Sequence, residues 1–181
     1  MLAAAKRLSA SRQLQFVIPV AATIDAPWLE KTILKYGIGQ ATLRTAVHAT
    51  YDAMQYCNMA VVASGTATLE AALQECPMVV VYRVSAFTWL VGKFLVKVPF
   101  YSIVNILAKK ELVPELMQSD FNAANVAARV EYLLDHPEAR QEMIRGFQAL
   151  KLRLGHAGAI ERAAGLIVAM LPSPQTASIP R

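Results

Sequence analysis

Apolar runs of strand length alternate with segments of helix length along the first half of the chain. The runs that predict strands cover residues 14–21, 41–49, 59–64 and 77–84. The segments that predict helices cover residues 26–37, 50–57 and 66–76. Strands that alternate with helices build parallel βαβ units. The pattern therefore predicts an α/β fold, a doubly wound parallel sheet with its ligand at the carboxyl ends of the strands.

Helical patterns fill the carboxy-terminal third. They predict helices over 120–135, 136–155 and 157–172, with Asp135 and Glu138 spaced as a capping pair around Pro137. The final stretch, 172–181, has the composition of a disordered tail. We therefore expect one domain over residues 1–171 and a tail over 172–181.

Apolar side chains also recur at helical spacing between residues 85 and 98, where Ser85 is a candidate N-cap. Trp89, Lys93 and Lys97 lie on the opposite side of this predicted helix. The pattern fits a core-facing helix with a solvated lysine edge. It equally fits an interfacial helix whose aromatic rings lie at headgroup depth and whose lysines contact anionic lipid. On the second interpretation, these three residues contact a membrane.

Composition indicates that the chain can bury a sizeable core and that its net charge is positive. The chain has 181 residues, of which 55% are hydrophobic, which excludes a disordered chain, and a formal net charge of +5. Residues 76–110 contain no Asp or Glu but include five basic side chains: Arg83, Lys93, Lys97, Lys109 and Lys110. Such a window attracts anions such as phosphate groups or an acidic membrane surface. Nucleic acid is disfavoured as a partner, because the dense Lys/Arg clustering of a phosphate-tracking surface is lacking.

The lack of recognisable targeting signals and the small number of cysteines indicate the cellular compartment. No uncharged apolar window is long enough to span a bilayer, and the first residues lack the continuous apolar region of a secretory signal. Cys57 and Cys76 are too few for a disulfide framework and match no metal motif, so we expect two buried small hydrophobes in a reducing compartment. The chain is expected in the cytoplasm, without a metal or cofactor.

The stretch VVASGTATLEAAL, residues 61–73, places a bare turn between a strand and a helix. A strand that ends at Ser64 and turns through Gly65 into a helix at Thr66 presents unpaired N–H groups and the positive end of a helix dipole. Phosphate or pyrophosphate is the usual occupant of such a turn. Glu70, one turn further along, can accept hydrogen bonds from ribose hydroxyls. An ordinary N-cap followed by a solvated glutamate gives the same pattern, so both interpretations stay open.

In their order along the chain, four segments resemble the carboxy-terminal half of lipid A disaccharide synthase. They are LQFVIPVA, residues 57–84, residues 95–118, and the closing helices with RLG…GA. The resemblance covers nearly all of residues 2–171 and is most specific at 60–83 and 101–118. It implies a Rossmann-like parallel sheet flanked by helices, the carboxy-terminal domain of a GT-B glycosyltransferase. That family joins UDP-diacylglucosamine to diacylglucosamine 1-phosphate and releases UDP, and the resemblance implies no metal.

The resemblance assigns roles to particular residues. Ser64, Gly65 and Thr66 would hold the donor pyrophosphate, Glu70 would bind the nucleotide sugar, and Asn105 would contribute to the active site. The segment that closes the donor cleft would supply Glu111, Pro114, Glu115 and Gln118. A simpler alternative for Asn105 is a loop residue that bonds its own backbone.

Simpler alternatives also exist for two of the acidic residues, because Glu111 and Glu115 can complement the positive end of the following helix. Against the family pattern, Val104 replaces a proline, and the pair Lys109–Lys110 replaces Gly-Arg, so a glycine turn is lost.

The family's amino-terminal domain, with its acidic catalytic residue, acceptor pocket and G-S-R loop, has no counterpart before Met1. We therefore expect a donor-binding fragment that lacks its first strand and is inactive alone. The alternative is a non-catalytic basic module for membrane binding or assembly. The expected partners are the UDP-diacylglucosamine donor, a lipid acceptor, a missing amino-terminal half or homodimer partner, and the inner face of the inner membrane as a peripheral site.

Overall fold

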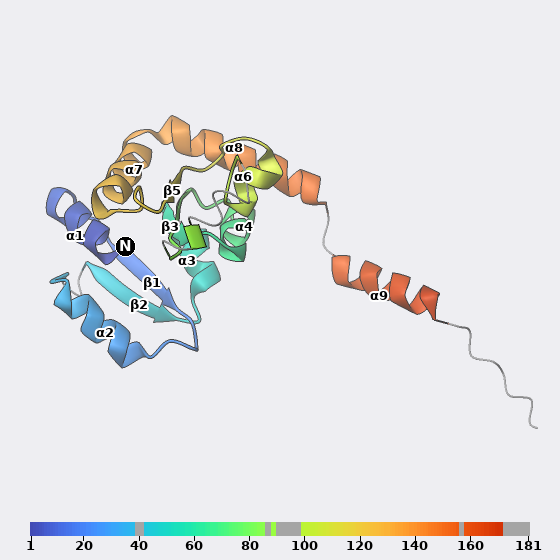
Figure 1. Cartoon of the computed structure of the whole chain (residues 1–181), viewed down its shortest axis with the longest axis horizontal. Helices are drawn as coiled ribbons and strands as arrows, with labels where there is room; N and C mark the ends of the chain where they lie inside the picture. Colours follow the sequence, from blue (N-terminus) through green and yellow to red (C-terminus); the bar gives the residue numbers. More distant parts are fainter. Residues whose placement is uncertain (39–41, 86–87, 90–98, 156–157, 172–181) are drawn as a thin grey trace, which may run out of the picture.

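A computed structural model describes residues 1–38, 42–85, 88–89, 99–155 and 158–171 (Figure 1). The amino-terminal half alternates helices and strands: α1 (Leu2–Ser11), β1 (Phe16–Val20), α2 (Ala26–Lys35), β2 (Leu43–Val47), α3 (Thr50–Tyr56), β3 (Ala60–Ala63), α4 (Thr66–Leu73) and β4 (Met78–Tyr82). The remaining elements are α6 (Ile103–Ala108), β5 (Glu115–Met117), α7 (Ala123–Asp135), α8 (Pro137–Leu154) and α9 (Ala159–Met170). The α/β class predicted from the sequence is confirmed.

The strands form two parallel sheets. In the first, β1 pairs with β2, and Phe16 lies opposite Leu43. In the second, β4 lies between β3 and β5, and Ala60 of β3 lies opposite Met78. Residues 78–81 of β4 are all buried, as expected for a central parallel strand that is covered on both faces.

The main core forms around β3–β4–β5. Helix α7 packs against β4, α4 packs against β3 and α8, and α1 packs across α7. Phe147 of α8 is the largest fully buried side chain in the described part of the chain. A smaller cluster of Ile33, Ile38 and Leu43 joins α2 to β2. Both sheets are therefore held by helices, and Phe16 of β1 packs against both clusters.

Gly146, inside α8, allows a close approach between this helix and the segment before β5. A Cβ atom at this position would lie 2.1 Å from Leu112 Cδ1, which is far too close for two carbon atoms. Only glycine lets Leu112 lie against the backbone of α8 as it does here.

The predicted strands and helices of the first half are confirmed, with shorter ends. Helix α4 ends at Leu73 rather than at residue 76, because Glu75 adopts a left-handed backbone with φ of 57° that ends the helix. The three carboxy-terminal helices are confirmed as well. The sequence pattern did not predict the short elements α6 and β5.

The predicted capping pair around Pro137 is wrong, although Pro137 does begin α8. His136 occupies the N-cap position and makes no side-chain cap bond. Asp135 belongs to the end of α7 and instead accepts a hydrogen bond from Arg12, which follows α1. Asp135 therefore joins two helices, α1 and α7, that are far apart in the sequence.

Only part of the predicted helix over 85–98 lies within the described residues. Ser85 Oγ accepts a hydrogen bond from the Thr88 N–H at 3.1 Å, so the predicted N-cap is confirmed. Lys93, Lys97 and the tail 172–181 lie outside the described residues.

The two cysteines, Cys57 directly after α3 and Cys76 shortly before β4, contact each other. Cys76 is buried, as predicted, whereas Cys57 is half-buried, and their sulfur atoms lie 3.2 Å apart. The hydrogen bond from Cys76 lowers the pKa of Cys57 to about 7, and the same contact raises the pKa of Cys76. Cys57 is therefore the more readily ionised thiol of the pair.

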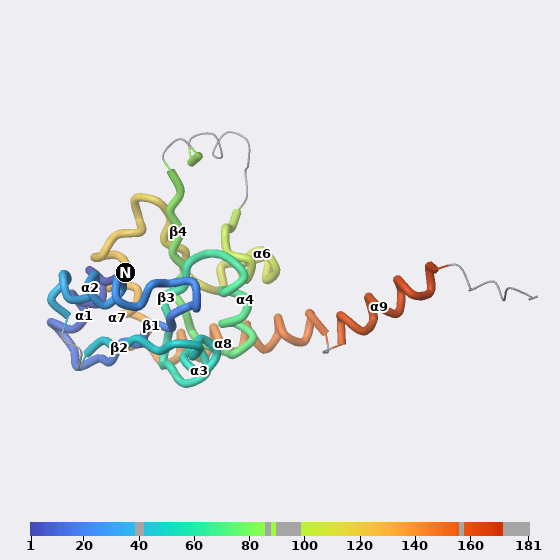
Figure 2. The backbone as a smooth tube through the Cα atoms, turned by 90° about the horizontal axis from the view of Figure 1, so that it is seen from below, coloured from blue at the N-terminus to red at the C-terminus, as the bar shows by residue number. Residues whose placement is uncertain are grey.

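Helix α9 extends away from the rest of the structure in both views (Figure 2). It contains no buried residue, and its side chains Ile160 and Met170 are 82% and 84% exposed. Within the described ranges, no helix combines the length and the apolar character that a membrane span requires.

Lys109, directly after α6, adopts the left-handed backbone with φ of 56° that glycine adopts without strain. A side chain costs about 1 kcal/mol in this conformation. We therefore expect Lys109→Gly to raise the free energy of unfolding by about 1 kcal/mol, measured by urea denaturation.

The matched control is Lys110→Gly, because Lys110 does not have a positive φ. This change is expected to leave stability unchanged or lower it, since glycine increases the entropy of the unfolded chain. Equal effects of the two substitutions would contradict the strain at Lys109.

Candidate functional site

The turn from β3 into α4 lies at the carboxyl end of the strand. The Ser64 N–H donates to Val81 O at 2.9 Å, which is the last bond between β3 and β4. The buried Thr68 then closes the turn, because its N–H and its hydroxyl both donate to Gly65 O, at 3.1 and 2.7 Å. No described group accepts a hydrogen bond from the N–H of Gly65, Thr66 or Ala67. The first turn of α4 therefore presents free backbone donors.

Gly65 leaves the space in front of these donors open. Its φ of 159° is one that residues with a side chain rarely adopt, and a Cβ atom built on it would have no neighbour within 4 Å. Gly65 and Thr66 are both exposed. An anion can therefore approach the N–H groups of the turn without meeting a side chain.

Glu70, one turn into α4, is half-buried, and its carboxylate makes no hydrogen bond or ion pair within the described ranges. Glu111 is exposed and likewise makes no such contact there. The carboxylates of both residues are therefore available to a ligand.

Asn105 lies at the centre of a buried hydrogen-bond network. Its side chain is fully buried, and its Oδ1 accepts hydrogen bonds from the N–H groups of Leu112 at 2.7 Å and Val113 at 2.9 Å. Its Nδ2 donates to Val113 O at 2.8 Å and to Glu115 Oε1 at 2.7 Å. The Asn105 N–H donates to Ser102 Oγ, which caps α6. Asn105 is therefore not the loop residue bonding its own backbone that the alternative described, because it lies within α6 and bonds residues 112, 113 and 115.

Glu115 connects this network to the turn after β3. Its Oε2 accepts a hydrogen bond from the Tyr101 N–H at 2.9 Å, and its Oε1 accepts one from the Ser102 N–H at 2.9 Å. Ser64 Oγ donates to the carbonyl of Tyr101 at 3.2 Å. Ser64, Asn105 and Glu115 are therefore joined through residues 101–102. Glu115 complements the start of α6, the helix before it, rather than the following helix.

Gln118 extends the pairing of β4 with β5 beyond the ends of both strands. Its N–H donates to Tyr82 O at 3.0 Å. Its side-chain amide accepts from the Val84 N–H at 3.0 Å and donates to Val84 O at 3.3 Å. The amide thus takes the place of a further strand residue opposite Val84 and fixes the path of the chain after β4.

Arg83, one of the basic side chains of the acid-free window, is engaged within the protein. Its guanidinium donates to the carbonyls of Gln118 and Phe121 and lies 5.2 Å from the centre of the Phe121 ring. These contacts stabilise the end of the sheet at which β4 and β5 finish.

Trp89 is half-buried and packs at a tilt against Tyr101, with ring centres 5.8 Å apart. Tyr101 and Ser102 are the contributors that the sequence pattern missed, although a serine three residues before Asn105 is a recognisable cap signal. The described residues include no group of three His, Cys, Asp or Glu side chains that could hold a metal ion.

The chain is similar to a family of bacterial enzymes. The sequence model of the family described as Lipid-A-disaccharide synthetase matches residues 1–168. Curated proteins named lipid-A-disaccharide synthase are 42% identical over 173 residues in Myxococcus xanthus, 39% over 157 residues in Syntrophus aciditrophicus and 38% over 177 residues in Solibacter usitatus.

These matches cover nearly all of this chain but less than half of each relative. They span 95%, 87% and 97% of the chain, and 44%, 40% and 45% of the respective relatives. The chain therefore spans somewhat under half the length of the curated relatives that it matches.

The network around Asn105 predicts a large effect on stability. Asn105→Ala leaves the buried N–H groups of Leu112 and Val113 without an acceptor, and each such loss costs about 1–3 kcal/mol. We expect the free energy of unfolding to fall by about 3 kcal/mol, measured by urea denaturation.

Asn125→Ala provides the control, because the Asn125 side chain donates one exposed bond, to Asp120 O. Its loss is expected to cost less than about 1 kcal/mol. A similarly small effect for Asn105→Ala would show that the buried network does not stabilise the fold.

Proposed function

The chain belongs to the lipid-A-disaccharide synthase family, and we propose that it supplies the part of a glycosyltransferase that binds the nucleotide-sugar donor. The proposed donor is UDP-diacylglucosamine. The observation that supports this most directly is the turn of free N–H groups at Ser64, Gly65 and Thr66, where β3 ends and α4 begins. Ligands of doubly wound sheets bind beyond the carboxyl ends of the strands, where this turn lies.

In this proposal the turn binds the pyrophosphate of the donor. Transfer of the sugar leaves negative charge on the phosphate of the departing UDP. Free N–H groups and the positive end of the α4 dipole stabilise that charge without reorganising. Glu70, whose carboxylate has no protein partner in the described ranges, accepts hydrogen bonds from the ribose hydroxyls.

We propose that Asn105 contributes to the active site by positioning other groups. All four of its side-chain hydrogen bonds go to protein atoms. Through Glu115 and Tyr101 it holds the carbonyl that accepts the Ser64 hydroxyl. Glu111, Glu115 and Gln118 close the donor cleft from the β5 side, and the Glu111 carboxylate, which has no partner among the described residues, is available to the ligand.

Transfer of the sugar to diacylglucosamine 1-phosphate needs the acceptor hydroxyl deprotonated and aligned on the anomeric carbon. We propose that the acceptor pocket and the base come from the part of the family's length that this chain does not span. The chain then acts together with an amino-terminal half or a second copy, at the cytoplasmic face of the inner membrane. The competing proposal is a basic membrane or assembly module that does not bind a nucleotide.

Binding of UDP separates the two proposals. We expect calorimetry to detect UDP binding, and Gly65→Val to weaken it at least about tenfold, because the new side chain would fill the space that the phosphates occupy. The same change should also lower thermal stability somewhat, because residues with a side chain rarely adopt the φ of 159° found at Gly65, although no protein atom lies within 4 Å of the added Cβ.

Gly165→Val in α9 is the control for adding a side chain, because Gly165 also has no neighbour within 4 Å of a Cβ. This variant should bind UDP like the unchanged chain. Absence of binding at millimolar UDP would refute the donor site. Equal binding by the Gly65 and Gly165 variants would place the nucleotide elsewhere.

The proposed membrane contact through Trp89, Lys93 and Lys97 is tested with lipid vesicles. The chain should sediment with anionic but not with neutral vesicles, and about 1 M salt should release it, because the Debye length then falls to about 3 Å. Lys93→Glu combined with Lys97→Glu should weaken sedimentation severalfold.

Lys31→Glu combined with Lys35→Glu is the control, because these lysines have the same spacing on α2. An equal loss in both double variants would mean that net charge alone drives binding. Equal sedimentation with neutral vesicles would indicate hydrophobic adsorption instead.

A further inference from the structure

The two cysteine side chains form a close pair within the fold. The sulfur atoms of Cys57 and Cys76 lie 3.2 Å apart, although the residues are 19 positions apart along the chain. Both are free thiols. A disulfide bond is about 2.05 Å long, so the two sulfur atoms need to approach each other by only about 1 Å to form one. The pair is therefore close enough to bond without a rearrangement of the fold.

Hydrogen-bonded backbone holds both residues in place. Cys57 ends α3, and its N–H donates to Ala53 O at 3.1 Å. The N–H of Cys76 donates to Ala71 O at 3.0 Å, which closes the turn between α4 and β4. The contact between the sulfur atoms is therefore set by ordered backbone on both sides.

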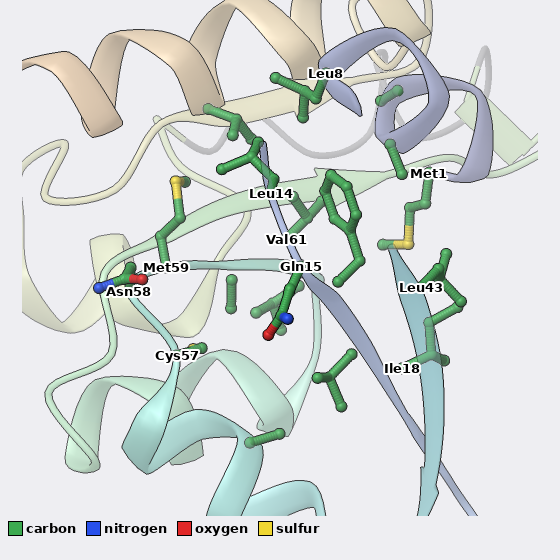
Figure 3. Close-up of a pocket in the computed structure, with 18 of the residues that line it drawn as sticks. Met1, Leu8, Leu14, Gln15, Ile18, Leu43, Cys57, Asn58, Met59 and Val61 are labelled. Carbon is green, nitrogen blue, oxygen red and sulfur yellow. The ribbon is translucent and has the colours of Figure 1, made fainter. Parts of the chain in front are cut away.

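The two thiols differ in their access to small molecules. Cys57 is half-buried and is among the residues that line a cavity of about 600 Å³, where it lies beside Asn58 and Met59 (Figure 3). None of the residues that line this cavity has a charged side chain. Cys76 is 2% exposed and does not line the cavity. A small uncharged reagent can therefore reach the Cys57 sulfur before it reaches Cys76.

The two thiols also differ in how readily they lose a proton. The hydrogen bond from the Cys76 thiol, together with backbone N–H groups at Cys57 and Met59, lowers the pKa of Cys57 to about 7, although burial opposes this shift. The contact with Cys57, and burial, raise the pKa of Cys76. The thiolate is the nucleophilic form of cysteine, and oxidants attack it selectively. Cys57 is therefore the thiol that reacts first with an oxidant, while Cys76 keeps its proton.

Cys57 combines the three properties of redox-sensing cysteines, which are a low pKa, access from solvent and a second thiol close enough to react with the oxidised sulfur. We propose that Cys57 and Cys76 form a redox-sensitive modification site, at which a small hydroperoxide converts the two thiols into one reversible disulfide. Hydrogen peroxide is small and uncharged, which suits a cavity without charged side chains. The inference does not depend on the binding of UDP.

The reaction at Cys57 and Cys76 balances in two steps. The Cys57 thiolate attacks one oxygen of hydrogen peroxide and the O–O bond breaks, which leaves a sulfenic acid on Cys57 and a hydroxide that takes up the proton released by Cys57. The Cys76 sulfur then attacks the Cys57 sulfur, the S–O bond breaks, and the oxygen leaves as water with the proton of the Cys76 thiol. The two thiols lose two electrons in total, and the peroxide is reduced to two molecules of water. A dithiol reverses the change by thiol–disulfide exchange.

The disulfide would enclose the candidate donor site in a covalent loop. Residues 57–76 contain all of β3, the turn at Ser64 and all of α4. Cys57 also ends the helix that packs against β1, whereas Cys76 shortly precedes the central strand of the other sheet. The bond would therefore restrict opening of the chain where the two sheets meet. In a reducing compartment a bond of this kind is usually transient and redox-sensing rather than a permanent support.

Mass spectrometry of the whole chain tests the proposal. The reduced chain is treated with a slight excess of hydrogen peroxide, and the remaining thiols are then alkylated. We expect the mass to fall by two hydrogen atoms and neither cysteine to take up the alkylating reagent. A protease that cleaves after glutamate cuts at Glu70 and Glu75, between the two cysteines. The peptides that carry Cys57 and Cys76 should therefore remain joined until a dithiol is added.

Two single substitutions separate the roles of the cysteines. Cys76→Ser keeps a hydrogen-bond donor beside Cys57 but removes the second thiol, so a sulfenic acid should accumulate on Cys57, where dimedone labels it. Cys57→Ser is the matched control, and its remaining thiol should be oxidised at least about tenfold more slowly. Stronger labelling of Cys76 than of Cys57 would overturn the proposal. The disulfide in the unchanged chain remains decisive if either variant does not fold.

The disulfide should also stabilise the fold. Closing the loop between residues 57 and 76 is expected to raise the thermal midpoint by about 5 °C, and a dithiol should restore the original value. Cys57→Ser treated with the same peroxide should show no rise. An unchanged or lower midpoint in the oxidised chain would mean that the bond distorts the fold, which would contradict a pair already placed for bonding.

Three further results would overturn the proposal. The first is oxidation of Met54 and Met59, which line the same cavity, while both thiols remain free. The second is a disulfide between two chains, visible as a dimer on a non-reducing gel. The third is full alkylation of both cysteines after treatment with peroxide.

Discussion

The carboxylate of Glu115 and the amide of Asn105 satisfy the backbone of two loops at once, and the geometry of the candidate site depends on them. They bind the N–H groups of residues 101–102 on one side and of residues 112–113 on the other. Burying the Asn105 amide and half-burying the Glu115 carboxylate is costly without partners, so this arrangement is stable only when the bonds are complete. Because Tyr101 in turn accepts the Ser64 hydroxyl, the same network sets the environment of the turn after β3.

A second constraint is the parallel sheet itself. Parallel strands expose their carboxyl ends on one edge, and the first donors of the next helix follow directly. In this chain that edge carries Ser64 and Gly65 after β3, and Arg83 with Gln118 after β4 and β5. The first pair leaves backbone donors free, whereas the second pair is committed to bonds within the protein. This difference is the reason that the proposed donor site lies at the end of β3 rather than at the end of β4.

The sequence predicted the parts of this structure that have a local period. The strand β4, buried over residues 78–81, and the turn at Ser64 and Gly65 both followed from patterns of a few neighbouring residues. Helix α6 and strand β5 are too short for a period, and the Asn105–Glu115 bonds that fix them join residues ten positions apart. Spacing alone also misassigned Asp135, whose partner Arg12 is close in space and distant along the chain. That Glu70 has no partner among the described residues, and that all side-chain bonds of Asn105 go to protein atoms, could be learned only from the folded structure.

Gly146, inside α8, couples the residue allowed in this helix to the residue allowed at position 112, next to the candidate site. Glycine in a helix interior costs up to about 1 kcal/mol relative to alanine, so it persists where a larger residue cannot be placed. At position 146 the obstacle is Leu112, whose own N–H binds Asn105. A side chain can enter at 146 only if the Leu112 side chain becomes smaller or turns to another rotamer, and neither change removes its backbone N–H from Asn105. Among related sequences, a larger residue at 146 is therefore expected to accompany a smaller one at 112.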